Sequence, residues 1–211
     1  VVAAKTQYPE GAEKMLIKKV MGRQVPSGKL PADVGCVVSN TSTAKAISDA
    51  IQKGMPLVER AVSVTGDFIR NPGNYMVKLG TNVQELIDHC GGITGDDVVL
   101  KMGGPMMGAP LKDTNVPIIK GSNGVIAIAA DHTEEKECIK CGRCVDVCPM
   151  ELQPLEIYKY GQLGDAEKLL TLNVMDCFSC KCCEYICSSK IPLVSKINAA
   201  KGLVMPLLKK K

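Results

Sequence analysis

The chain has 211 residues, of which 45% are apolar and 23% charged, a composition typical of folded domains rather than of disordered chains. Aromatic residues make up only 3% and Trp is absent, so the core must be aliphatic. The formal net charge of +4 arises from 26 basic and 22 acidic residues, and this mild excess makes nucleic acid a poor candidate for a partner.

The start of the sequence and its apolar runs bear on targeting and membranes. The chain opens VVAAKTQYPE without an initiator Met and without a charged region followed by an apolar stretch, so we expect a piece whose upstream domains are missing. The longest apolar run, GVIAIAA at 124–130, is far shorter than the roughly 18 residues of a spanning helix. We therefore expect that this chain does not cross a membrane.

The first predicted elements are a helix, a strand and a second helix. Apolar spacing predicts a helix at about 12–21, ended by Gly22. The apolar run 34–38 fits a buried strand. The polar residues 40–43 then supply capping groups for another helix. The residues expected on the inner face of that helix are Ala46, Ile47, Ala50 and Ile51.

From Arg60 the apolar period shortens to two, which is typical of strands. Strands are expected at 61–66 and 75–80, joined by a turn at 71–74. The remaining expected elements are a helix capped by Thr81 or Asn82, with Val83, Leu86, Ile87 and Cys90 on one face, and strands at 97–101 and 124–129. Residues 60–130 thus read as a small sheet crossed by one helix, an α+β module. After Asp131 the pattern is helical, with a short amphipathic stretch around 166–172.

Cysteine is the most informative residue type. The chain holds 11 cysteines, nine of them between residues 138 and 187. An odd total concentrated in one segment, without a secretion signal, argues against a secreted disulfide framework and for metal chemistry in a reducing compartment. Cys36 and Cys90 fall in apolar patterns, and we interpret both as small core residues.

The clustered cysteines form two copies of one spacing, Cys-x2-Cys-x2-Cys-x3-Cys, which is the bacterial ferredoxin pattern for [4Fe-4S] clusters. In two-cluster ferredoxins the fourth cysteine of each copy binds the other cluster. The predicted ligand sets are therefore Cys138, Cys141, Cys144 and Cys187 for one cluster, and Cys177, Cys180, Cys183 and Cys148 for the other.

Two alternatives remain open for these cysteines. Zinc favours paired Cys-x2-Cys knuckles with a longer spacer and does not account for three successive close steps. Cys182 lies beside Cys183 and breaks the pattern; we interpret it as a small non-coordinating residue, although a ligand swap between the two stays possible. The second copy also lacks the proline that follows the first, Pro149. No catalytic residue is identified.

Several phrases of the sequence, together with the doubled cysteine groups, resemble the C subunit of the Rnf complex, a membrane-bound ferredoxin:NAD oxidoreductase that pumps sodium ions or protons. The phrases are YPEGAEKMLI (8–17), GRQVPSGKLPADVG (22–35), VVSNTSTA (37–44), PLVERAVSVTG (56–66), GGPMMG (103–108) and IPLV (191–194). The resemblance covers nearly the whole chain.

The resemblance implies an α+β architecture in three parts. Residues 1–58 would be the C-terminal part of an FMN/NADH-binding α/β domain similar to the flavin subunit of respiratory complex I. Residues 59–130 would be a β-grasp module of the SLBB type, for which a scaffold role is the expectation. Residues 131–211 would be a mainly α-helical ferredoxin domain with two [4Fe-4S] clusters.

The resemblance also implies cofactors, contacts and partners. In the related flavin subunit two phrases contact FMN, and the matching positions here are Tyr8, Gly11, Glu13, Asn40 and Thr43. The implied function is an oxidoreductase subunit that passes electrons between two [4Fe-4S] clusters and FMN or NAD(H), with the NAD site partly outside this chain. The implied partners are the other subunits of an Rnf-type complex, NAD(H) and, indirectly, ferredoxin. The implied location is peripheral, at the cytoplasmic face of the inner membrane.

Two other functions compete with this interpretation. The closest is a flavin and iron–sulfur cobalamin reductase of propanediol-using microcompartments, which shares the modular plan. The other is a non-redox interaction module whose clusters or zinc are structural.

Overall fold

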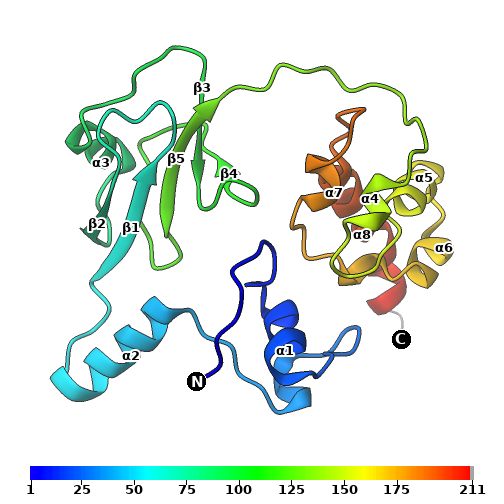
Figure 1. Cartoon of the computed structure of the whole chain (residues 1–211), viewed down its shortest axis with the longest axis horizontal. Coiled ribbons are helices and arrows are strands. Elements are labelled where there is room, and N and C mark those ends of the chain that lie inside the picture. Colours follow the sequence, from blue (N-terminus) through cyan, green and yellow to red (C-terminus); the bar gives the residue numbers. More distant parts are fainter. Residues whose placement is uncertain (210–211) are drawn as a thin grey trace. The chain divides into compact units, whose positions relative to one another are not determined.

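The computed structural model describes residues 1–209, and these form two compact units. One unit combines Val1–Val38 with the chain from Thr133 onward, and the other is Ser39–His132. The first unit is helical and the second contains the sheet, as the coiled ribbons and arrows in Figure 1 show. The predicted α+β class is therefore confirmed.

The second unit is organised around a five-stranded sheet with the strand order β2-β1-β5-β3-β4. The β1–β5 pair is parallel, and the other neighbouring strands are antiparallel. The strands are β1 (Glu59–Thr65), β2 (Gly73–Lys78), β3 (Val98–Met102), β4 (Ala109–Pro110) and β5 (Gly124–Ala129). All the predicted strands after residue 60 are confirmed; the sequence missed only the two-residue β4.

Helix α3 (Val83–His89) packs with the sheet to form the core of this unit. The Asn82 side chain accepts a hydrogen bond from the Gln84 amide at 2.9 Å and so caps the helix. Period-two alternation turns Val62 and Val64 of β1 into the core, and the helix contributes its own apolar face. The residues of α3 and its C-cap that are buried there are Val83, Leu86, Ile87 and Cys90. The predicted cap and inner face are confirmed.

The prediction of a strand at 34–38 is wrong. A short 3₁₀ helix, η1, spans Pro31–Val34, and Val37 is 89% exposed. Pro31 fixes a helical φ, and the Asp33 carboxylate accepts a hydrogen bond from the Leu30 amide at 2.8 Å, so a helical turn forms here. The sheet strands that the structure describes all lie between residues 59 and 129, so the run has no ladder partner.

Helix α2 (Thr41–Lys53) forms as predicted, but its expected inner face is exposed. Asn40 caps it by accepting a hydrogen bond from the Ser42 amide at 2.9 Å. Ile47 and Ile51 are 52% and 79% exposed, and no residue of the helix is buried. Local capping and helix propensity therefore form this element without tertiary packing of its apolar side.

The helical unit is centred on α8 (Leu193–Lys209), which contacts α5, α6, α7 and η2. Its core is aliphatic, as the scarcity of aromatic residues required; Ile157, Leu169, Val174 and Ile197 are fully buried. The other elements are α1 (Glu13–Met21), α4 (Arg143–Asp146), α5 (Pro154–Leu163), α6 (Ala166–Thr171), η2 (Val174–Asp176) and α7 (Cys182–Tyr185). The predicted first helix and the helical character after Asp131 are confirmed.

Substitution of Gly66 tests the sheet packing. Gly66 follows β1 at φ +116°, and a Cβ built there would lie 2.0 Å from the Ala127 carbonyl oxygen in β5. We expect Gly66→Ala to lower the free energy of unfolding by about 3 kcal/mol or more, because backbone strain and a steric clash combine. Urea unfolding measures the change. Gly121→Ala, where a Cβ meets nothing within 4 Å, is the control and should change stability by less than about 0.5 kcal/mol; equal effects would contradict the packing.

Candidate metal centres

Each cysteine group forms a tight loop followed by a single helical turn, α4 in the first copy and α7 in the second. Corresponding positions of the two loops adopt the left-handed conformation. These pairs are Lys140 (φ 56°) with Ser179 (φ 61°), Gly142 (φ 77°) with Lys181 (φ 66°), and Glu151 (φ 57°) with Lys190 (φ 52°). The sequence duplication is thus matched by a duplicated backbone conformation, which non-glycine residues adopt only when the surrounding structure requires it.

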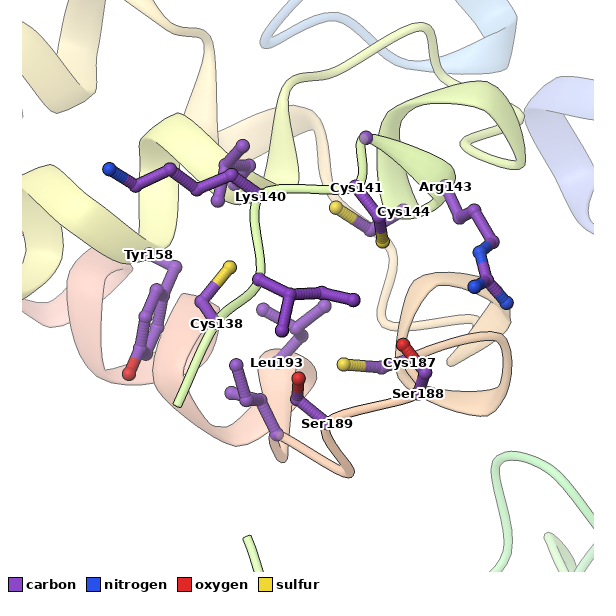
Figure 2. A pocket seen from close by; sticks show the side chains of 14 residues that line it. Cys138, Lys140, Cys141, Arg143, Cys144, Tyr158, Cys187, Ser188, Ser189 and Leu193 are labelled. Carbon is purple, nitrogen blue, oxygen red and sulfur yellow. The ribbon is translucent and has the colours of Figure 1, made fainter. Parts of the chain in front are cut away.

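The first site is a cavity lined by Cys138, Cys141, Cys144 and Cys187. Figure 2 shows the sulfur atoms of these four residues facing the same space. Aliphatic and aromatic side chains form much of the remaining wall, together with the polar side chains of Lys140, Arg143, Ser188 and Ser189. The aliphatic and aromatic residues are Ile139, Leu155, Tyr158, Ile191 and Leu193.

The second site is a cavity lined by Cys148, Cys177, Cys180 and Cys183. Its remaining walls are again mainly apolar, with Leu152, Pro154, Val194 and Ile197 among them. The structure therefore brings together the same two sets of four cysteines that the sequence predicted, with Cys148 and Cys187 exchanged between the groups.

Hydrogen bonds join the ends of the two cysteine groups beside the first site. The Lys136 amide donates to the Ser189 carbonyl at 2.9 Å. The Ser189 hydroxyl donates to the Glu137 carbonyl at 2.8 Å, and Ser189 is only 5% exposed. These bonds hold the residue before Cys138 against the segment that follows Cys187, so that both thiols reach one cavity.

Burial sets the acid–base behaviour of the cysteines. It raises the pKa of the Cys183 thiol to about 12, because the thiolate loses solvation and faces the neighbouring Cys177 and Cys180 sulfurs. Burial likewise raises the pKa of Cys144, Cys148 and Cys180. Deprotonation of these buried thiols therefore needs a bound positive group, and a metal centre supplies one.

The donor sets fit a cluster better than a single ion. Within residues 1–209, no three His, Cys, Asp or Glu side chains are grouped closely enough to hold one metal ion. Zinc requires its sulfur ligands at about 2.3 Å from a single point, whereas a [4Fe-4S] cube spreads four thiolates around its volume. Four cysteines spaced around each cavity match the second arrangement.

The extra cysteines lie outside both cavities. Cys182 begins α7 and is half-buried, and the lining of the second site includes Cys183 instead of Cys182. Cys90 is completely buried in the core of the sheet unit, as predicted. Cys36 is only half-buried, and the strand in which we expected it is absent.

The residues predicted to contact a flavin fall into different units. Tyr8, Gly11 and Glu13 belong to the helical unit, whereas Asn40 and Thr43 lie at the start of α2 in the sheet unit. The structure therefore does not gather the five into one unit. Tyr8 has a partner of its own: its hydroxyl donates a hydrogen bond to the Cys180 carbonyl at 2.6 Å.

Sequence reasoning missed two residues that support the second site. The Lys201 ammonium on α8 donates to the Cys177 carbonyl at 2.6 Å, and the Ser179 hydroxyl lies 3.1 Å from the Asn198 side-chain oxygen. Asn198 and Lys201, the two supporting residues, lie about one helical turn apart on α8. No sequence signal singled them out, because their role depends on how α8 packs against a loop that precedes it in the chain.

Three domain families match successive parts of the chain. The description "Nuo51 FMN-binding domain" matches residues 1–49, "SLBB domain" matches residues 61–110, and "4Fe-4S dicluster domain" matches residues 137–191. The domain matches and the two cysteine sites thus place the chain among proteins that combine an FMN-binding part with a 4Fe-4S dicluster domain, and they support FMN and [4Fe-4S] clusters as cofactors.

Similar proteins identify the family. The C subunit of the ion-translocating oxidoreductase complex of Rhodobacter capsulatus is 46% identical over 200 residues, covering 93% of this chain and 38% of that protein. The C subunit of the Na⁺-translocating ferredoxin:NAD⁺ oxidoreductase complex of Acetobacterium woodii is 42% identical over 204 residues, covering 95% of this chain and 46% of that protein. The chain belongs to this family of C subunits, the Rnf family, as its motifs predicted, and it spans less than half the length of these relatives. No helix within the described residues has the length and apolar character needed to span a membrane.

Ser189 provides a test of how the first site is held together. Ser189→Ala removes a buried donor and leaves the Glu137 carbonyl unpaired, so we expect the free energy of unfolding to fall by about 1–3 kcal/mol. Urea unfolding of the cluster-free chain measures this. Ser195→Ala, an exposed position on α8, is the control, and a loss no larger than in that variant would show that the bond contributes nothing.

Proposed function

We propose that this chain conducts electrons between two [4Fe-4S] clusters and FMN in the C subunit of an ion-translocating ferredoxin:NAD⁺ oxidoreductase. The observation that supports this most directly is the pair of four-cysteine cavities with exchanged fourth members. Structural zinc has no need of that exchange, whereas two electron-carrying clusters benefit from it because it keeps them within one small domain.

The first and second sites would each hold one cluster through their four thiolates. Each cluster would exchange single electrons, and its potential would depend on hydrogen bonds, charge and burial around the sulfurs. Apolar side chains make up much of the wall of both cavities. Cys141 is exposed in the first site, while Cys180 and Cys183 are buried in the second. The two clusters would therefore differ in their solvent contact.

For FMN we propose contacts from Tyr8, Gly11, Glu13, Asn40 and Thr43. The match of residues 1–49 to an FMN-binding domain supports this assignment. Asn40 and Thr43 stand at the N-terminus of the 13-residue helix α2, where free amide groups and the helix dipole suit a phosphate. A flavin would couple the single electrons of the clusters to the electron pair of NAD(H). We place the NAD(H) site partly outside this chain.

The remaining assignments follow from the family. We propose the domain boundaries 1–58, 59–130 and 131–211, which the three domain matches support. The named relatives are subunits of multi-subunit complexes, so the proposed partners are the other subunits of such a complex and, through them, ferredoxin. The proposed location is the cytoplasmic face of the membrane, as a peripheral subunit, with the SLBB part as a scaffold.

The proposed ligand sets predict the effect of single substitutions on cluster content. We expect the anaerobically prepared protein to hold about eight iron and eight sulfide per chain. Cys187→Ser should remove the same electron paramagnetic resonance signal as Cys141→Ser, although the two residues belong to different cysteine groups. Cys148→Ser and Cys180→Ser should each remove the other signal.

Cys182→Ser is the matched control for these variants, because Cys182 lies beside a proposed ligand but outside the cavity lining. It should leave iron, sulfide and both signals unchanged. Zinc without sulfide in the parent protein would instead indicate a structural module without redox function. If Cys187→Ser instead removed the signal that Cys180→Ser removes, the exchanged ligand sets would be refuted.

Flavin content tests the proposed FMN contacts. In the full-length protein Glu13→Ala and Asn40→Ala should each lower the FMN retained per chain severalfold, because each removes a polar contact. Flavin fluorescence after release measures the content. Asn82→Ala is a matched control, since Asn82 caps α3 in the same way that Asn40 caps α2 and is not a proposed flavin contact. Unchanged loading in both test variants would disprove the assignment.

A further inference from the structure

Within the helical unit, the N-terminal segment 8–18 contacts residues around the second site. The Tyr8 hydroxyl donates to the Cys180 carbonyl across 172 positions of sequence. The Lys14 ammonium lies 3.9 Å from the carboxylate of Asp176, the residue before Cys177. The Lys18 ammonium lies 3.1 Å from the carboxylate of Glu151.

All three contacts reach residues close in sequence to a cysteine of the second site. Met15 and Val25 also line a small hollow with Pro149 and Met150, the two residues that follow Cys148. The segment therefore meets the second site through polar contacts and through apolar packing. Residues 1–49, to which it belongs, are also the part of the chain that matches an FMN-binding domain.

The loop of the second site is fixed from two sides. Tyr8 binds the Cys180 carbonyl, and Lys201 on α8 binds the Cys177 carbonyl, both at 2.6 Å. A donor at the carbonyl of a ligand cysteine neutralises the negative end of a dipole near the cluster, and an ammonium adds positive charge. Both effects favour the reduced, more negative cluster.

We propose that Tyr8 is a positioning residue for the second site, and that the cluster of this site is the one that exchanges electrons directly with the flavin. The second half of this proposal rests on the proposed function. Each transfer moves one electron and breaks no bond: the reduced cluster of the second site is oxidised by one electron as the flavin is reduced by one, or the reverse. The first site then exchanges electrons with the flavin only through the second.

Redox titration of the full-length protein, followed by electron paramagnetic resonance, tests the role of Tyr8. Tyr8→Phe should reduce the equilibrium constant for reduction of the second-site cluster two- to tenfold, where tenfold corresponds to 59 mV for one electron. Lys201→Met should shift the same cluster in the same direction. The controls are Tyr185→Phe, an exposed tyrosine within the second cysteine group, and Lys209→Met, an exposed lysine on α8. Unchanged potentials, or a shift of the first-site cluster instead, would overturn the positioning role.

Stopped-flow reduction by NADH tests the order of the two sites. In Cys148→Ser, which lacks the second-site cluster, reduction of the remaining cluster by NADH should slow at least a hundredfold, while dithionite still reduces it. In Cys187→Ser the second-site cluster should be reduced at the rate of the parent protein. Fast reduction of the first-site cluster in Cys148→Ser would overturn the order.

These outcomes separate this proposal from the proposed function. If the parent protein retains no FMN, or NADH reduces neither cluster in it, the proposed function fails, and the order of the sites with it. The potentials of the Tyr8 and Lys201 variants do not depend on flavin, so the positioning role is decided by them alone. If Cys148→Ser fails to hold any cluster, Lys201→Met still decides, because Lys201 supports the second site and is not a proposed flavin contact: its flavin-to-cluster transfer should be slowed at full FMN content, and an unchanged rate would overturn the order.

Discussion

The exchange of one cysteine between the two groups is the constraint on which the helical unit depends. Cys148 belongs to the first group in sequence but lines the second site, and Cys187 does the reverse. Neither site can be completed by its own group, so the loops that lead into α4 and α7 must lie side by side. The bonds of Ser189 and Lys136 secure that arrangement. Both sites and the aliphatic core around α8 are therefore parts of one cooperative structure.

The chemistry of the thiols strengthens this dependence. Apolar side chains make up much of the cavity walls, and burial raises the pKa of Cys144, Cys148, Cys180 and Cys183. Such thiols are ligands only as thiolates, so ligand deprotonation, metal binding and folding are linked. Several of the cysteines also pack against the hydrophobic core; Cys183 is itself a member of it. A bound cluster would thus act as part of the core as well as an electron carrier.

The two sites have similar ligands but different surroundings. Corresponding loop positions share the left-handed conformation, which shows how closely the duplication is kept. At the second site, however, the N-terminal segment supplies Tyr8 and the last helix supplies Lys201 as donors to ligand carbonyls. Elements far apart in sequence thereby make one copy of the duplicated motif different from the other. Under the proposed function, a difference of this kind would give the two clusters different potentials.

Features that depend on near neighbours in the chain could be predicted from the sequence. Cysteine spacing identified both groups and their exchanged members, the side chains of Asn40 and Asn82 marked two helix starts, and period-two alternation located β1 and β2. Other features depend on partners that lie far away in sequence, and these needed the folded structure. The run 34–38 has the composition of a strand but no neighbouring strand, and Ile47 and Ile51 of α2 have the pattern of a buried face but remain exposed. Tyr8 and Lys201 reach the second cysteine loop only because the N-terminal segment and α8 pack on it. Local interactions fix how a segment is shaped, whereas only packing decides what that segment touches.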